Sequence, residues 1–148
     1  MTIPLVYDRV APSTSKEETM GDRATFVFEQ GDANSAIYLY GHWAGDGMMN
    51  ILASAIEISR PRWDDESYAT RIVISQIIGN EWQEEMGWGI STYFCDSEHS
   101  VPIVNFQTQT IKLIPNSWDI KFDINAEPKF TMGFDQFINK FAKYLTAA

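Results

Sequence analysis

Residues 24–41 read ATFVFEQGDANSAIYLYG, and this stretch decides the fold. Its two halves are rich in aromatic and β-branched residues, and the Gly-Asp-Ala-Asn sequence at 31–34 between them is typical of a turn. We therefore expect a hairpin with strands over 24–30 and 35–40. Three glycines, at positions 41, 45 and 47, then break regular structure.

Two helices are expected after this hairpin. Apolar residues recur at the spacing of one helix face, at Met48, Ile51, Leu52, Ala55 and Ile56. They predict a helix that Asp46 caps and that ends near Ser59, before Pro61. Asp64 or Asp65 is expected to cap a second helix, which carries Glu66 in its first turn and ends at Gly79.

The rest of the chain predicts strands and a last helix. We expect a short strand over 89–94, a hairpin over 101–106 and 110–114, and a strand over 118–124, where apolar and charged residues alternate. An apolar stripe predicts a helix over 134–145. The fold class is α+β, a single domain with one antiparallel sheet and about three helices packed on one face. Residues 1–22 read as an N-terminal extension or mobile arm, and residues 23–148 as the domain.

The formal net charge is −9, and residues 20–100 carry it. This segment holds thirteen acidic and four basic residues. The lack of a basic face argues against direct binding of nucleic acid and against attraction to anionic membranes. Cys95 is the only cysteine, and no signal peptide or membrane-length apolar run is visible. We therefore expect a cytoplasmic protein.

All four basic residues of this acidic segment are arginines: Arg23, Arg60, Arg62 and Arg71. Arginine among carboxylates suits fixed, forked hydrogen bonds to carboxylate or phosphate groups. Salt bridges to neighbouring acidic residues, such as Asp64, Asp65 or Glu66, are the simpler interpretation.

His42-Trp43 is the first candidate for a binding site. The pair lies between a predicted strand and a predicted helix start, where loops commonly hold ligands. The glycines around it would let a ligand approach the backbone, although they match no phosphate-binding fingerprint. In the alternative interpretation, Trp43 anchors the core and His42 is a hydrogen-bonded residue of the junction.

The second candidate precedes the next predicted helix and consists of Arg62, Trp63, Asp64, Tyr68 and Arg71. Tyr68 and Arg71 share one helix face. If that face points toward His42, one pocket would combine aromatic planes, forked donors and a titratable ring, which suits a stacked base and a bound anion. The alternative is a salt-bridged helix start packed under Trp63.

Metal binding and cysteine catalysis have weaker signals. Acidic residues and one histidine cluster loosely at Glu81, Glu84, Glu85, Glu98 and His99, but without the spacing of known metal motifs. Cys95 has only His99 nearby as a base. We therefore expect no metal site and no cofactor.

Four strings together resemble a known family. They are Met20-Gly21-Asp22-Arg23-Ala24, Tyr38 to Gly45 (YLYGHWAG), Arg62-Trp63-Asp64-Asp65 with Tyr68 and Arg71, and Gly87 to Thr92 (GWGIST). Their order and spacing resemble those of small uncharacterised proteins of bacteriophages and their bacterial hosts, over residues 20 to about 112. The resemblance implies a phage-type setting and no mechanism.

Three functions remain open. The first is a binding protein, not an enzyme, that holds a small anionic or nucleotide-like ligand and in a phage setting could sequester a host defence signal. The second is an acidic interaction protein of the nucleic-acid mimic type, which covers a basic host protein. The third is a small hydrolase that uses His42 with Asp64 or Asp65. Five tryptophans permit a dimer interface without requiring one.

Overall fold

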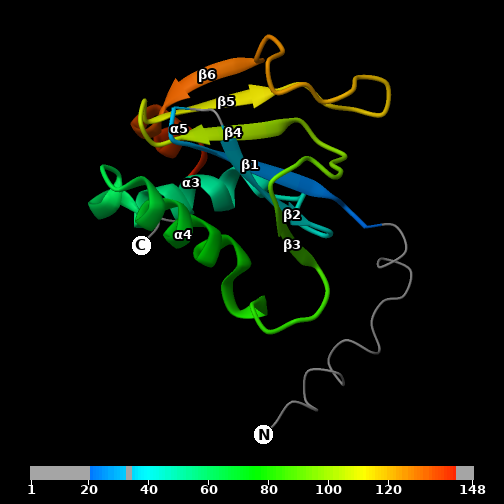
Figure 1. The fold of residues 1–148 in the computed structure, drawn as a ribbon, viewed down its shortest axis with the longest axis horizontal. Coiled ribbons are helices and arrows are strands. Elements are labelled where there is room, and N and C mark those ends of the chain that lie inside the picture. Colours follow the sequence, from blue (N-terminus) through cyan, green and yellow to red (C-terminus); the bar gives the residue numbers. More distant parts are fainter. Residues whose placement is uncertain (1–20, 33–34, 143–148) are drawn as a thin grey trace, which may run out of the picture.

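The computed structural model describes residues 21–32 and 35–142, and these form one open sheet with three α-helices (Figure 1). The strands are β1 (Ala24–Gln30), β2 (Ser35–Gly41), β3 (Trp88–Ser91), β4 (Val101–Asn105), β5 (Thr110–Ile114) and β6 (Phe130–Gly133). The helices are α3 (Met48–Ile58), α4 (Glu66–Ile78) and α5 (Phe134–Phe141), and short 3₁₀ turns follow α3 (Arg60–Arg62) and α4 (Gly79–Glu81).

The sheet has the order β3-β2-β1-β4-β5-β6. β1 pairs antiparallel with β2 and parallel with β4, and every other neighbouring pair is antiparallel. The expected α+β fold with three helices is therefore confirmed, with one parallel pair in the centre of the sheet. That pair arises because β3 runs in the same direction as β1, and residues 92–100 then carry the chain past β1 to enter β4 in that direction again.

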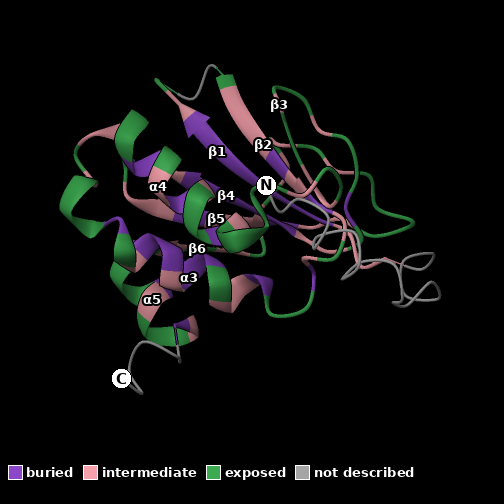
Figure 2. Ribbon diagram, turned by 90° about the horizontal axis from the view of Figure 1, so that it is seen from below, coloured by how far each residue is buried: buried purple, intermediate pink, exposed green. Residues whose placement is uncertain are grey.

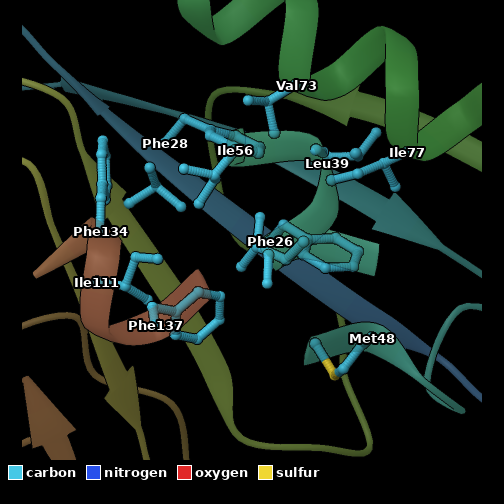
Figure 3. Packing of buried hydrophobic residues seen from close by; sticks show 14 of the residues in the cluster. Phe26, Phe28, Leu39, Met48, Ile56, Val73, Ile77, Ile111, Phe134 and Phe137 are labelled. Atoms are coloured by element: carbon cyan, nitrogen blue, oxygen red, sulfur yellow. The ribbon is translucent and has the colours of Figure 1, made fainter. Parts of the chain in front are cut away.

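The main core lies between the sheet and the helices (Figure 3). Phe26 and Phe28 point from β1 to this side, while Val27 between them points to the other face. Ile56 of α3, Val73 of α4 and the fully buried Phe137 of α5 cover the phenylalanines. Full burial of one such side chain contributes about 1.5–3 kcal/mol, so this layer holds the helices on the sheet.

The opposite face of the sheet has a smaller apolar cluster. Val27, Val101, Ile103 and Ile114 are buried there, and loops rather than helices cover them. Phe94 and Phe122 lie stacked, with ring centroids 4.4 Å apart, and join the loop after β3 to the loop after β5. Figure 2 shows the result, with the buried residues concentrated in the central strands and the inward turns of the helices.

The predicted strand over 118–124 is wrong. Ser117 and Ile120 exchange two backbone hydrogen bonds in a turn, and Asn125 N donates to Asp123 Oδ1 in the next one. The apolar residues of the alternating pattern only partly enter a core, since Phe122 packs on Phe94 while Trp118 and Ile120 stay exposed. The strand of this region is β6, which pairs with β5.

Several predicted boundaries also move. Gly47, with φ 74°, occupies the N-cap of α3 in place of Asp46, so helix α3 begins one residue later than expected. Asp65 is at the N-cap of α4, but its side chain makes no capping hydrogen bond. β3 starts at Trp88 and ends at Ser91, and the last residues of the helix predicted over 134–145 lie outside the described part of the chain.

Candidate functional site

The structure separates the predicted site residues into two groups at opposite ends of β1 (Figure 1). His42 lies at the start of the strand, where its carbonyl accepts a hydrogen bond from Asp22 N at 2.8 Å. At the other end, Gly31 N donates to Glu66 Oε1, in the first turn of α4, at 2.9 Å. Seven strand residues span roughly 20 Å. The single pocket that was expected to combine His42 with Arg62, Trp63 and Tyr68 is therefore not formed.

Trp63 is a structural residue. Its Nε1 donates to Ile56 O at 3.0 Å and to Ser59 Oγ at 3.2 Å, so the indole closes the end of α3. The ring meets Phe134 edge-on at 4.9 Å, and the Arg60 guanidinium covers it at 4.3 Å. The indole ring is therefore held by packing, and its N–H adds a donor to the carboxyl end of α3, where the last carbonyl groups of a helix need partners.

Arg62 and Tyr68 form a surface pair in which the guanidinium lies 4.9 Å from the ring centroid. Arg62 also lies 3.7 Å from Asp65, whereas Asp64 and Arg71 are exposed on the same end of the molecule. The alternative of a salt-bridged helix start describes this region better than a ligand clamp does. Asp64 and Asp65 lie at the opposite end of the sheet from His42, so the three residues cannot share one substrate position.

A cleft is present around His42 itself. His42 Nδ1 lies 2.9 Å from the hydroxyl oxygen of Tyr40, and His42 N donates to Gly87 O at 2.8 Å. The Trp43 ring meets the imidazole edge-on, with centroids 4.6 Å apart. Burial raises the pKa of Tyr40, Arg23 opposes this change, and the carboxylates of Asp96 and Glu98 add to it. The phenol therefore stays protonated at neutral pH and holds the imidazole in one orientation.

Trp88 supplies the second indole of the cleft. A side chain on Gly41 would collide with the Trp88 ring, so this glycine allows the indole to lie against the backbone of β2. Trp88 Nε1 donates to Glu81 Oε1 at 2.7 Å, which fixes the ring at the edge of the sheet. Gly87, with φ 105°, turns the chain between the two indoles, close to Trp43.

These residues enclose a hollow of about 300 Å³, here called the indole cleft. It is lined by Tyr40, His42, Trp43, Glu85, Met86, Gly87, Trp88 and Gly89. A second hollow of about 340 Å³ lies between the start of α3 and the end of α4 and shares Trp43 and Trp88 with the first. Three-hundred cubic ångströms is at the small end of ligand sites, enough for a single ring system.

Sequence reasoning found His42 and Trp43 of this cleft but missed its other wall. Residues 85–89 reach it because β3 pairs antiparallel with β2, with Gly41 opposite Trp88 and Tyr40 opposite Gly89. The predicted strand over 89–94 overlaps β3, the strand that forms this wall. The pairing of this strand with the predicted strand over 35–40 was not predicted, however, so nothing joined Trp88 to Trp43.

A larger hollow of about 690 Å³ lies on the face of the sheet opposite the helices, between the loops after β3 and β5. Its one arginine, Arg23, is 2.7 Å from Asp96 and 3.1 Å from Glu98. These carboxylates neutralise the guanidinium, so it serves to join β1 to the loop before β4. Arg23 thus forms salt bridges within the protein, which was the simpler of the two interpretations of the arginines in residues 20–100.

Cofactor and membrane features can be assessed only for the described residues. Within 21–32 and 35–142, no three His, Cys, Asp or Glu side chains are placed to hold a metal ion, and Cys95 is exposed. None of the helices in this part of the chain has the length and apolar character needed to cross a bilayer.

Comparisons of the chain with protein-family models, with curated proteins and with solved structures found no match.

Proposed function

We propose that the protein binds a ligand through one planar ring, such as a nucleobase, in the indole cleft. The observation that carries this proposal is the convergence of Trp43, Trp88 and a hydrogen-bonded His42 on one hollow of about 300 Å³. Aromatic side chains stack on nucleobases with about 1–3 kcal/mol per base, without needing a specific sequence of donors.

The cleft favours a neutral or cationic ring. Glu85 is the charged residue among those that line it, and lysine and arginine are missing from this lining set. Aromatic faces attract cations, and a carboxylate adds to that attraction. Because Arg62 and Arg71 lie elsewhere, the clamp expected for an anion is missing here, and the base of a nucleotide-like ligand rather than its phosphate would be recognised.

The biological setting of the proposal rests on the resemblance to phage proteins. A phage protein that binds a nucleotide-derived signal in the host cytoplasm could sequester it without turnover. The arrangement at His42 supports binding rather than hydrolysis, because the partner of its Nδ1 is the Tyr40 hydroxyl and not a carboxylate.

Thermal unfolding with nucleosides and their monophosphates tests the proposal. We expect a rise in Tm of several degrees with at least one nucleoside, because a ligand that binds only the folded state stabilises it. The matching monophosphate should give a similar rise, since no cation of the cleft receives its phosphate. Trp43→Ala should abolish the shift, and Trp118→Ala, at an exposed indole on another loop, should keep it.

Two results would contradict the proposal. One is the absence of any shift with all four common nucleosides at concentrations of about 1 mM, which would leave no binding stronger than about 4 kcal/mol. The other is a shift that Trp43→Ala leaves unchanged.

The acidic interaction protein remains a second candidate function. The observation that favours it is a group of exposed apolar side chains beside the acidic residues at 81–85.

A further inference from the structure

Exposed apolar side chains gather on and around β3. Trp82, Met86, Ile90 and Tyr93 are 72%, 64%, 59% and 65% exposed. We call these four residues the β3 face. They fall within twelve consecutive positions, and two of them are aromatic. Exposed apolar residues that gather in one segment of a folded domain commonly mark an interaction site, since leaving them in water gives no stability.

β3 lies at the edge of the sheet. It pairs with β2 on one side, and in the described strands it ends the order β3-β2-β1-β4-β5-β6. An edge strand presents unpaired backbone N–H and C=O groups that can pair with another extended chain. Natural proteins often protect such an edge with lysine or proline, and Trp88–Ser91 contains neither.

The charge around the β3 face is entirely acidic in sequence. No lysine or arginine occurs between Arg71 and Lys112, a stretch that contains five carboxylates. Arg23 neutralises two of these, Asp96 and Glu98. Glu81 and Glu85 come from the segment that leads into β3 and carries Trp82 and Met86, and Glu81 accepts a hydrogen bond from Trp88 Nε1. A partner that covers the β3 face therefore meets negative charge at its rim.

We propose that β3 is a docking edge for an extended segment of a protein partner in which basic and apolar residues alternate. Such a segment would extend the sheet by one strand through backbone hydrogen bonds, place its apolar side chains on the β3 face, and direct its lysines or arginines to the glutamates. The docking edge adjoins the indole cleft, because Met86 and Glu85 also line that cleft, but the inference does not require a ring to be bound there.

Charge complementarity selects this occupant over two others. A second copy of the chain would bring the same glutamates together across the interface, and like charges in contact oppose association. Nucleic acid would meet carboxylates instead of the cations that its phosphates require.

The probe for the test is a labelled peptide of roughly seven residues with alternating valine and lysine, the length of an ordinary strand. Its binding is followed by fluorescence anisotropy. We expect measurable binding that weakens as salt is raised, because the lysines face carboxylates. The same peptide with N-methyl groups on alternate residues should lose about tenfold or more in affinity, because it cannot donate to an edge strand.

Variants of the protein locate the site. Ile90→Lys should weaken the peptide by about tenfold, because it places a cation in the apolar face and in the path of the peptide lysines. Ile58→Lys makes the same change at an exposed position on α3 and should have little effect. Trp82→Ala should weaken binding, whereas Trp118→Ala should not.

The proposal is overturned if the peptide does not bind at about 1 mM, or if its N-methylated form binds equally well. It is also overturned if Ile58→Lys weakens binding as much as Ile90→Lys does, since the attraction would then be only that of an acidic protein for a basic peptide.

Discussion

His99 Nε2 lies 2.6 Å from Asp22 Oδ1, and this pair joins the loop before β4 to the residues that lead into β1. Gly45, in the loop between β2 and α3, packs against both side chains and donates its N–H to Asp22 O at 2.9 Å. Three segments distant in sequence therefore meet beside His42. Asp22, assigned by the sequence to the extension over 1–22, contacts the domain through this pair.

Asp22→Asn should lower the free energy of unfolding by about 1 kcal/mol, because the amide replaces a carboxylate that is hydrogen-bonded to His99. The effect is modest because both side chains are more than one-third exposed. Chemical unfolding measures it. Asp32→Asn removes the same charge in the exposed turn after β1 and should cost less than half as much; equal losses would contradict a specific contact.

Gly45→Ala should destabilise the protein by about 2 kcal/mol through overpacking. The new Cβ would collide with both His99 Nε2 and Asp22 Oδ1, so one of them must move. Gly89→Ala is the matched control, because a Cβ there meets open space and its backbone φ is not in the left-handed region. An alanine at 45 as harmless as one at 89 would show that the three segments do not pack as described.

The geometry at α3 separates two interpretations of Trp63. Trp63→Phe should lower the free energy of unfolding by about 1–2 kcal/mol, because the Nε1 donor to Ile56 O and Ser59 Oγ is lost and Ser59 is buried. The variant should still give the nucleoside-induced rise in Tm. Loss of that rise in a folded Trp63→Phe variant would contradict the structural role and show that Trp63 contributes to ligand binding.

Tyr40 makes stability depend on pH at the alkaline end. Burial raises its pKa above 10 in the folded protein, so the folded state keeps a proton that the unfolded chain releases. The contribution is complete below pH 10 and is lost as the pH rises from the unfolded value through the folded one. Tyr40→Phe should make the decline in stability above pH 10 shallower, as seen by chemical unfolding at several pH values. A decline equal to that of the wild type would place the phenol in water.

Much of the fold could be predicted from local patterns. The hairpin at 24–41 carries two strands and a turn sequence, and α3 has an apolar face of regular period. Both therefore appear close to where they were expected. The region over 118–124 was not predictable in this way. Its alternation imitates a strand, but Phe122 packs on Phe94, a residue whose position depends on a loop far away in sequence.

The site was predicted less completely than the fold. His42 and Trp43 stood out because they lie at a strand-to-helix junction, and they do line a cleft. Arg62, Trp63 and Tyr68 were grouped with them only because a facing helix could have brought them near. The register of β1 decides otherwise, since it puts Gly41 and Glu66 at opposite ends of one strand. Local sequence patterns do not determine such a register.

The five tryptophans allow the central claim to be measured directly. Each indole N–H gives its own signal in a ¹H–¹⁵N NMR spectrum, so a nucleoside titration identifies which indoles meet the ring. We predict that the signals of Trp43 and Trp88 move together with added nucleoside, while those of Trp63 and Trp118 stay in place. Signals of Trp43 and Trp88 that do not respond, or that move no more than that of the exposed Trp118, would contradict the claim that the indole cleft is the binding site.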